Sequence, residues 1–182
     1  MNRPRHPSTP QAAFSLIELL LVIGIIALLV AMLMPALGRM RSRAKEISCM
    51  NNLRQVFLAA RMYADENGGK LPKIEPMPSI PADPGNPLES MAQALGAQLS
   101  QQTAVLRCPQ DQNGRFDREG TSYEWNATLN DKALDNITYG PIVVSPSVVI
   151  LCWDFDNVHP GKKSGEGLGK NYLYADGRIA VE

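Results

Sequence analysis

The sequence predicts an α+β protein in which one long N-terminal helix carries a small antiparallel β-sheet head. Residues 19–34 contain no polar side chain, residues 40–67 contain neither proline nor glycine, and residues 141–153 are rich in β-branched side chains. Such patterns are typical of a membrane segment, an amphipathic helix and strands, respectively. A chain of 182 residues leaves no room for a second large domain.

The apolar segment is long enough to cross a membrane. It runs from Phe14 to Leu37, and about 20 residues suffice for a transmembrane helix. A buried core helix is the alternative, but such helices are seldom apolar on every face. Residues 1–13 are polar and Pro-rich, with Arg3 and Arg5, as in a targeting leader. The apolar run continues well past the length of a secretory signal, so we expect it to remain in the product.

Glu18 is the one charged residue inside this apolar segment. An ionised carboxylate in the middle of a membrane helix costs about 2.5–3.5 kcal/mol on insertion scales, so it usually has a partner. Alternatively, Glu18 is close enough to the helix end to reach water. The position of Glu18 alone leaves both interpretations open.

The segment FSLIELLLVIGIIALLVAMLMPAL resembles the N-terminal segment of type IV pilins and type II secretion pseudopilins. The resemblance implies that a prepilin peptidase cleaves between Ala13 and Phe14 and that Phe14 is then methylated. It also implies that Glu18 acts in subunit assembly and that Pro35 bends the helix. Ala13 departs from the family, which normally has glycine before the cut.

This resemblance implies a structural subunit of a pseudopilus or pilus-like filament. Its partners would be other pilin-like subunits and an inner-membrane assembly platform, and its head would lie in the periplasm behind a single inner-membrane span. Four basic residues at positions 39–45 follow the span, which by charge counting alone predicts a cytoplasmic head. We follow the motif, because its cleavage site, acid and proline agree in spacing. The alternative function is a single-pass membrane-anchored binding module that does not polymerise.

We expect four parts along the chain: a leader at 1–13, a transmembrane helix at 14–37, an amphipathic spine helix at 38–68 and a periplasmic α+β head at 69–182. The spine helix should end at the glycine pair Gly68 and Gly69. Its predicted inward face has apolar residues at alternating spacings of three and four. These are Met50, Leu53, Phe57, Ala60 and Ala64.

Within the head, the Pro-rich residues 72–87 should form a surface connector and residues 88–99 have weak helical character. Strands are expected at residues 122–125 and, as one or two elements, at 141–153. Residues 171–182 (NYLYADGRIAVE) predict a hairpin with Asp-Gly in a type I′ turn.

The segments CMNNLRQ, RCPQD and NYLYADG more loosely resemble a prepilin-like family that is abundant in planctomycete-type bacteria. Members of that family often carry a histidine shortly before the final Asp-Gly turn. His159 is the corresponding residue here, with a longer spacer.

Composition excludes several functions. Lys and Arg together number 18, as do Asp and Glu, which argues against a nucleic-acid-binding tail. The sequence has no nucleophile elbow, P-loop, HExxH or paired-acid motif, so we expect no enzyme. We expect His159 to be a turn residue or a hydrogen-bonding partner.

Three cysteines and two histidines are too few and too scattered to predict a structural zinc site. Cys49 and Cys108 are candidates for a disulfide that closes a long loop. Three unconnected thiols, with Cys152 buried in a strand, are the alternative. We expect no cofactor; the one metal candidate is calcium, which suits oxygen-rich groups such as Asp154, Asp156 and Asp176.

Overall fold

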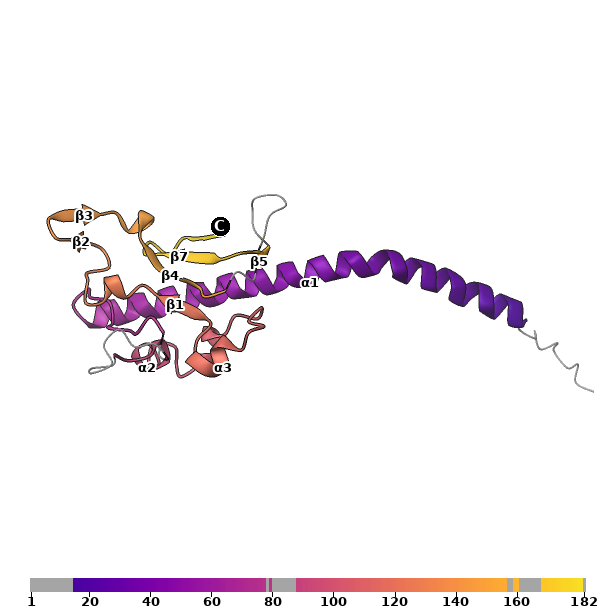
Figure 1. Ribbon diagram of the computed structural model, residues 1–182, viewed down its shortest axis with the longest axis horizontal. Helices are drawn as coiled ribbons and strands as arrows, with labels where there is room; N and C mark the ends of the chain where they lie inside the picture. The colour runs from indigo at the N-terminus through magenta and orange to yellow at the C-terminus, as the bar shows by residue number, and fades with distance from the viewer. Residues whose placement is uncertain (1–14, 78, 80–87, 157–158, 161–167, 182) are drawn as a thin grey trace, which may run out of the picture. The chain divides into compact units, whose positions relative to one another are not determined.

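The structure is a computed structural model that describes residues 15–77, 79, 88–156, 159–160 and 168–181 (Figure 1). It divides into two compact units, Met1–Met40 and Arg41–Glu182. Helix α1 (Leu16–Glu66) contributes residues to both units. Each unit is considered by itself below.

The first unit is helical from Leu16 onwards, and its large apolar side chains are exposed on every face of the helix. Helix α1 contains the one stretch, among the described residues, that is long and apolar enough to cross a membrane; none of that stretch is buried within the protein. Ser15 precedes the first turn and donates its backbone N–H to Glu18 Oε2 at 2.9 Å. Pro35 lies inside α1, which continues through it.

In the second unit, one face of α1 forms part of the core. The buried side chains of this face recur every three or four residues, as expected for an amphipathic helix. They are Glu46, Cys49, Leu53, Val56, Ala59, Ala60 and Ala64. The predicted face is confirmed in Leu53, Ala60 and Ala64, whereas Met50 and Phe57 are half-buried.

Helix α1 ends as the glycine pair predicts. Gly68 adopts a left-handed φ of +65°, which glycine tolerates without a Cβ clash. The Gly69 N–H then donates to the Ala64 carbonyl at 2.7 Å, as in a Schellman cap.

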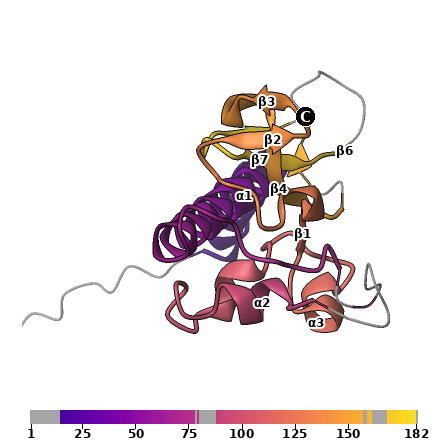
Figure 2. The same ribbon diagram turned by 90° about the vertical axis from the view of Figure 1, so that its left-hand side faces the viewer.

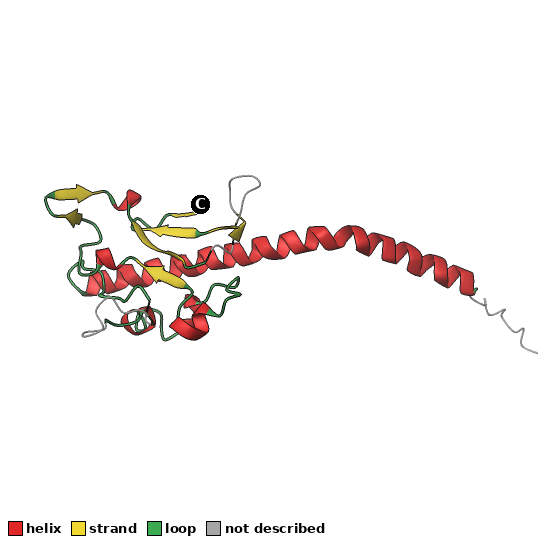
Figure 3. Ribbon diagram, in the orientation of Figure 1, coloured by secondary structure: helices red, strands yellow, loops and turns green. Residues whose placement is uncertain are grey.

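A four-stranded antiparallel sheet packs with α1 in this unit (Figures 1 and 3). Its strand order is β1-β4-β7-β8. The strands are β1 (Tyr123–Trp125), β4 (Ile150–Asp154), β7 (Asn171–Tyr174) and β8 (Ile179–Val181). Two further pairs are β2 (Ile137–Tyr139) with β3 (Ile142–Val144), and β5 (His159–Pro160) with β6 (Leu168–Gly169).

Short helices complete the head, and Figure 2 shows α2 and α3 on the side of the unit opposite the β2–β3 pair. The α-helices are α2 (Met91–Ala94) and α3 (Arg115–Glu119), and the 3₁₀ turns are η1 (Thr103–Leu106), η2 (Ala127–Leu129) and η3 (Pro146–Val148). Leu53, Trp125, Leu151 and Leu173 are among the largest fully buried side chains, so the core lies between α1 and the sheet.

The predicted α+β class, with its long helix and antiparallel sheet, is confirmed. Strands form in both predicted segments, and residues 141–153 supply two of them, separated by η3. The helical tendency of residues 88–99 yields only the four residues of α2. Most of the predicted connector at 72–87 lies outside the described residues.

The turn between β7 and β8 differs from the predicted type I′ turn. Gly177 donates its N–H to the Tyr174 carbonyl at 2.9 Å, and Tyr174 donates to the Arg178 carbonyl at 2.8 Å. Within this turn φ is positive only at Gly177, at +87°, whereas a type I′ turn needs positive φ at two residues. The chain therefore makes a type I turn followed by a left-handed glycine, a longer connection than Asp-Gly alone suggests.

Gly177 gives a test of how closely this hairpin approaches α1. A Cβ at position 177 would lie 2.7 Å from Phe57 Cε1, and φ is also left-handed there. We expect Gly177→Ala to lower the free energy of unfolding by about 2–4 kcal/mol, from backbone strain plus overpacking. Urea unfolding of the detergent-solubilised chain, followed by tryptophan fluorescence, measures the loss.

Gly140→Ala is the matched control, because Gly140 has φ +60° and open space where a Cβ would stand. It should lose only the strain contribution, about 1–2 kcal/mol. Equal losses for the two variants would show that the approach of Gly177 to Phe57 contributes nothing.

Candidate functional site

The N-terminal segment presents a carboxylate beside the start of a helix. Glu18 lies in the first turn of α1, is exposed, and accepts the Ser15 N–H. This is one half of a capping box, in which the acid three residues into a helix binds the backbone of the cap residue. Ala13 and Phe14, the predicted cleavage and methylation positions, lie outside the described residues.

The helix that follows has no partner within the described chain. Its large apolar side chains from Leu16 to Leu37 are between 43% and 79% exposed. Gly24 has no other atom within 4 Å of the position a Cβ would take, so another helix can approach closely there. This surface is suited to lipid or to packing against other apolar helices.

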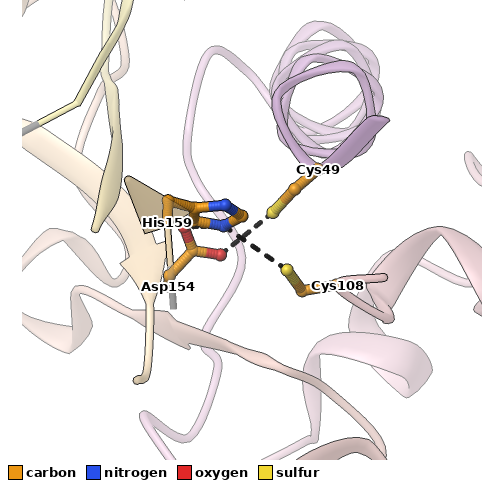
Figure 4. Close-up of side chains that lie close together, drawn as sticks. All are labelled: Cys49, Cys108, Asp154 and His159. Carbon is orange, nitrogen blue, oxygen red and sulfur yellow. Dashed lines mark hydrogen bonds and ion pairs between the residues drawn. The ribbon is translucent and has the colours of Figure 1, made fainter. Parts of the chain in front are cut away.

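A second candidate site lies in the core of the other unit, where four side chains that can bind metal ions converge (Figure 4). These are Cys49, Cys108, Asp154 and His159, and their ligand atoms all lie within 4.8 Å of one another. Each residue is at most 2% exposed. Among the described residues, this is the group of His, Cys, Asp and Glu side chains placed to share one metal ion.

Each member of this buried cluster comes from a different segment. Cys49 lies on the buried face of α1, one turn before Leu53. Cys108 follows η1, Asp154 is the last residue of β4, and His159 begins β5. Pairing of His159 with Gly169 of β6 holds the histidine backbone in place.

Short contacts join the four side chains. The Cys49 thiol donates to Asp154 Oδ1 at 3.0 Å. His159 Nε2 lies 3.0 Å from Asp154 Oδ2 and 3.5 Å from Cys108 Sγ. His159 Nδ1 is buried without a hydrogen-bond partner among the described residues.

Surrounding groups orient the cluster. The Asn171 backbone N–H donates to Asp154 Oδ2 at 2.8 Å, and the buried Tyr123 hydroxyl lies 3.4 Å from Cys49 Sγ. The backbone of Gln110 forms a hydrogen bond with the Cys108 thiol. The sulfurs and the carboxylate are therefore held from outside the cluster as well as within it.

The two thiols have opposite tendencies to ionise. The hydrogen bond with Cys49 is the main reason that the pKa of Cys108 is lowered, to about 6, and His159 adds to the effect. Burial and the same contact with Cys108 raise the pKa of Cys49. For His159, burial opposes the charge, but hydrogen bonds with Asp154 and Cys108 outweigh it and raise the pKa to about 9. The site thus stabilises the thiolate of Cys108 beside its hydrogen-bond partners Cys49 and His159.

This arrangement differs from that of a catalytic thiol. In a nucleophile–His–acid triad the acid binds one ring nitrogen and the nucleophile the other. Here Cys108 and Asp154 both meet Nε2 of His159, and all three side chains are closed off from solvent. The geometry brings metal-ligand atoms to one central point. This arrangement is better suited to binding a cation than to nucleophilic attack on a substrate.

Folding brings together four side chains that the sequence shows as too few and too scattered to predict a zinc site. Cys49 and Cys108 meet as predicted, but both are free thiols, so the predicted disulfide is not formed. Cys152 is a third free thiol, fully buried in β4 and outside the cluster. His159 is a hydrogen-bonding partner as predicted, and lies in a strand rather than a turn.

The predicted calcium ligands are not gathered into one group. Asp154 belongs to the buried cluster, whereas Asp156 accepts a hydrogen bond from Asn113 and lies 3.7 Å from Arg115 Nε. Asp176 accepts the Arg178 N–H within the β7–β8 turn. The acids are separated because β4 ends at Asp154, the chain bends at residues 155–156, and Asp176 lies in the turn between β7 and β8.

Two signals for this cluster are present in the sequence. Cys49 falls four residues before Leu53, so it continues the inward face of the predicted spine helix. Cys108 follows the apolar run of η1, whose Val105 and Leu106 are buried. The sequence does not show that the fold brings Cys49 and Cys108 to the end of β4 and to β5.

Comparison with known proteins identifies the N-terminal segment. Residues 9–34 match the family model described as the prokaryotic N-terminal methylation motif, which is the prepilin-type signal. Neither the curated proteins nor the solved structures contain a match to this chain. The motif indicates a pilin-like structural subunit that a prepilin peptidase processes and that a membrane helix anchors.

Removing the Asp154 charge tests how far the cluster supports the fold. Asp154 is 1% exposed and accepts from Cys49, His159 and Asn171. We expect Asp154→Asn to destabilise the unit by about 3–5 kcal/mol, because it breaks a buried charged pair by removing one partner. Trp125, at 1% exposed, reports unfolding in urea through its fluorescence.

Asp156→Asn is the matched control two residues along the chain. Its ion pair with Arg115 is partly exposed, so the expected loss is below about 1 kcal/mol. If Asp154→Asn cost no more than Asp156→Asn, the buried cluster would have no structural role.

Proposed function

We propose that this protein is a pilin-like structural subunit of a type II secretion pseudopilus or a type IV pilus-like filament. A prepilin peptidase would cleave it between Ala13 and Phe14, and Phe14 would be methylated. The observation that carries this proposal is the match of residues 9–34 to the methylation motif, which includes most of an apolar helix that is exposed on all sides. Such a helix needs lipid before assembly and neighbouring helices after it.

Glu18 is suited to controlling entry into the filament. In a bilayer its carboxylate is costly unless it has a donor or a cation. Within one chain it has the Ser15 N–H at 2.9 Å, at the end of the helix where the macrodipole favours an anion. Cleavage would place a charged amine at Phe14, and the Phe14 ammonium of a neighbouring subunit would then compensate the Glu18 charge more fully than a backbone N–H does.

Lateral contacts would continue along the part of α1 that lies in the second unit. The side of α1 that faces away from the core exposes Ile47, Leu58 and Met62, at 54%, 54% and 49%. These are large apolar side chains on a helix whose other face is buried in the core. They offer packing positions for the helices of adjacent subunits.

The head would lie on the periplasmic side after a single crossing of the inner membrane. The prepilin signal requires its leader on the cytoplasmic side, where the peptidase acts, whereas the basic cluster at residues 39–45 favours the opposite orientation. Because the peptidase can cleave only a leader that already lies on the cytoplasmic side, we place the head in the periplasm. An inner-membrane assembly platform and other pilin-like subunits would be the partners there.

Processing is tested by co-expressing the full chain with a prepilin peptidase and measuring the intact mass of the membrane product. We expect a chain that begins at methylated Phe14, and a full-length chain with an inactive peptidase. Ala13→Gly, which restores the usual residue before the cut, should raise the cleaved fraction. If neither the native chain nor Ala13→Gly is cleaved, the segment serves as an anchor and the non-polymerising binding module becomes the better hypothesis.

The assembly role of Glu18 is tested by Glu18→Ala and Glu18→Asp. Glu18→Ala should leave membrane insertion intact, since it removes a charge from an apolar segment, and should reduce incorporation into sheared filaments at least about tenfold, as expected for the loss of about 1.4 kcal/mol or more per contact. Glu18→Asp retains the charge and should retain part of the incorporation. Normal incorporation of Glu18→Ala would refute the role.

A further inference from the structure

We propose that Cys49, Cys108, Asp154 and His159 bind one Zn²⁺ ion in a closed structural site that fastens the head to α1. The proposal concerns the second unit alone and does not depend on filament assembly. Its starting observation is that four ligand atoms from four chain segments lie within 4.8 Å of one another in the core.

The spacing of the donor atoms suits a tetrahedral ion. Zinc–sulfur bonds of about 2.3 Å and zinc–nitrogen or zinc–oxygen bonds of about 2.0–2.1 Å place neighbouring ligand atoms roughly 3.3–3.8 Å apart. Here Cys108 Sγ and His159 Nε2 are 3.5 Å apart, while Cys49 Sγ to Asp154 Oδ1 and His159 Nε2 to Asp154 Oδ2 are each 3.0 Å. Only Oδ1 of Asp154 would ligate, because Oδ2 accepts the Asn171 N–H. Cys49 Sγ and Oδ1 would separate by about half an ångström to reach tetrahedral spacing.

The donor chemistry selects the metal. Two sulfurs, one imidazole and one carboxylate form a four-coordinate set of the kind that zinc accepts. Calcium needs six to eight oxygen ligands and magnesium needs octahedral oxygen coordination, which this site cannot supply. Copper(I) favours sulfur ligands, so the histidine and carboxylate make zinc the better match.

The direction of the side chains also fits ligation. Figure 4 shows the four side chains directed toward one common region from α1, the loop after η1, and strands β4 and β5. His159 directs Nε2 to that region, and both Cys108 and Asp154 approach this same nitrogen. One cation placed there would meet all four donors together.

An outer layer of hydrogen-bonding groups supports three of the four ligands, as metal sites commonly require; His159 Nδ1 has no such partner among the described residues. Tyr123 can donate its hydroxyl to a Cys49 thiolate, and the Gln110 backbone bonds to Cys108. The Asn171 N–H fixes the second oxygen of Asp154. These contacts direct the ligand atoms inward and leave the sulfurs, one carboxylate oxygen and Nε2 for the ion.

A disulfide between Cys49 and Cys108 explains less of the structure. It would use the two sulfurs and leave Asp154 and His159 buried beside a neutral bond, at the cost of desolvating both. Zinc instead uses all four groups, and its two positive charges offset two of the three negative charges of two thiolates and a carboxylate. Because all four residues are at most 2% exposed, no position is open to substrate, so the site would be structural and not catalytic.

The test measures metal in the full chain purified in detergent without chelators. We expect about one zinc per chain by inductively coupled plasma mass spectrometry, and less than about 0.1 in Cys49→Ser, Cys108→Ser and His159→Ala, as for loss of a ligand from a closed site. Cys152→Ser is the matched control, since Cys152 is equally buried but lies outside the cluster. It should retain the zinc.

A second measurement covers variants that fail to fold. Zinc is removed from the wild-type chain with a chelator, the thermal unfolding midpoint is recorded, and Co²⁺ is added under reducing conditions. We expect a lower midpoint of thermal unfolding without metal. On cobalt addition we expect a thiolate-to-cobalt absorption band and the intense visible bands of tetrahedral Co²⁺. Both results should hold for the wild-type chain and for Cys152→Ser.

Three results would overturn the proposal: a wild-type chain with neither zinc nor a tetrahedral cobalt spectrum, a Cys152→Ser variant that loses zinc as the cluster variants do, or a metal-free chain whose non-reduced peptide map links Cys49 to Cys108. The last result would establish the disulfide in place of the metal. None of these results depends on prepilin processing, so the two proposals can fail separately.

Discussion

The packing of the sheet and its loops on one face of α1 is the constraint on which the second unit depends. Helix α1 supplies six side chains of the hydrophobic core from one element. The close approach of Gly177 to Phe57 fixes the β7–β8 hairpin against that helix. In the sheet that packs on this face, β4 pairs antiparallel with β7, and Asp154 is the last residue of β4.

The same helix meets two different requirements along its length. Residues in the first unit are apolar on every face, while those in the second unit separate into a buried face and an exposed one. An α-helix tolerates this change because its backbone hydrogen bonds are internal and indifferent to the surroundings. A membrane segment and a domain scaffold can therefore be one continuous element, without a loop that would need hydrogen-bond partners of its own.

Features set by local patterns could be predicted from the sequence. The helix from the apolar segment to the glycine pair, the strands near residues 122–125 and 141–153, and the final hairpin all depend on periodicity or turn residues within a few positions. The prediction of a type I′ turn was wrong, because an Asp-Gly pair fits both a type I′ turn and a type I turn that is followed by a left-handed glycine. The local sequence does not distinguish them, and it also does not contain the close approach of Gly177 to Phe57.

The buried cluster could not be predicted for a related reason. Zinc sites are recognised in sequence by closely spaced ligand pairs, and here Cys49, Cys108 and Asp154 come from segments that meet only in the folded unit. Counting residues therefore missed a group of potential ligands that the fold brings together. The helical periodicity did place Cys49 inward, so burial of that cysteine was predictable while its partners were not.

The buried cluster also bears on how a small head can be held to a long helix. Apolar packing alone gives a domain of this size limited stability, and buried polar groups lower it further unless they are satisfied. The four ligand residues are hydrogen-bonded to one another in the core, and a bound ion would in addition crosslink the segments that carry them. A single ion would join α1 to three other segments at the N-terminal end of the buried face, where Cys49 is the first apolar member.

Zinc ligation would also keep the two sulfurs from oxidation in a disulfide-forming compartment, because a metal-bound thiolate in a closed site is shielded from exchange. The position of the cluster, at the edge of the packed face and not at its centre, is where such a crosslink would most restrain the head from opening away from α1.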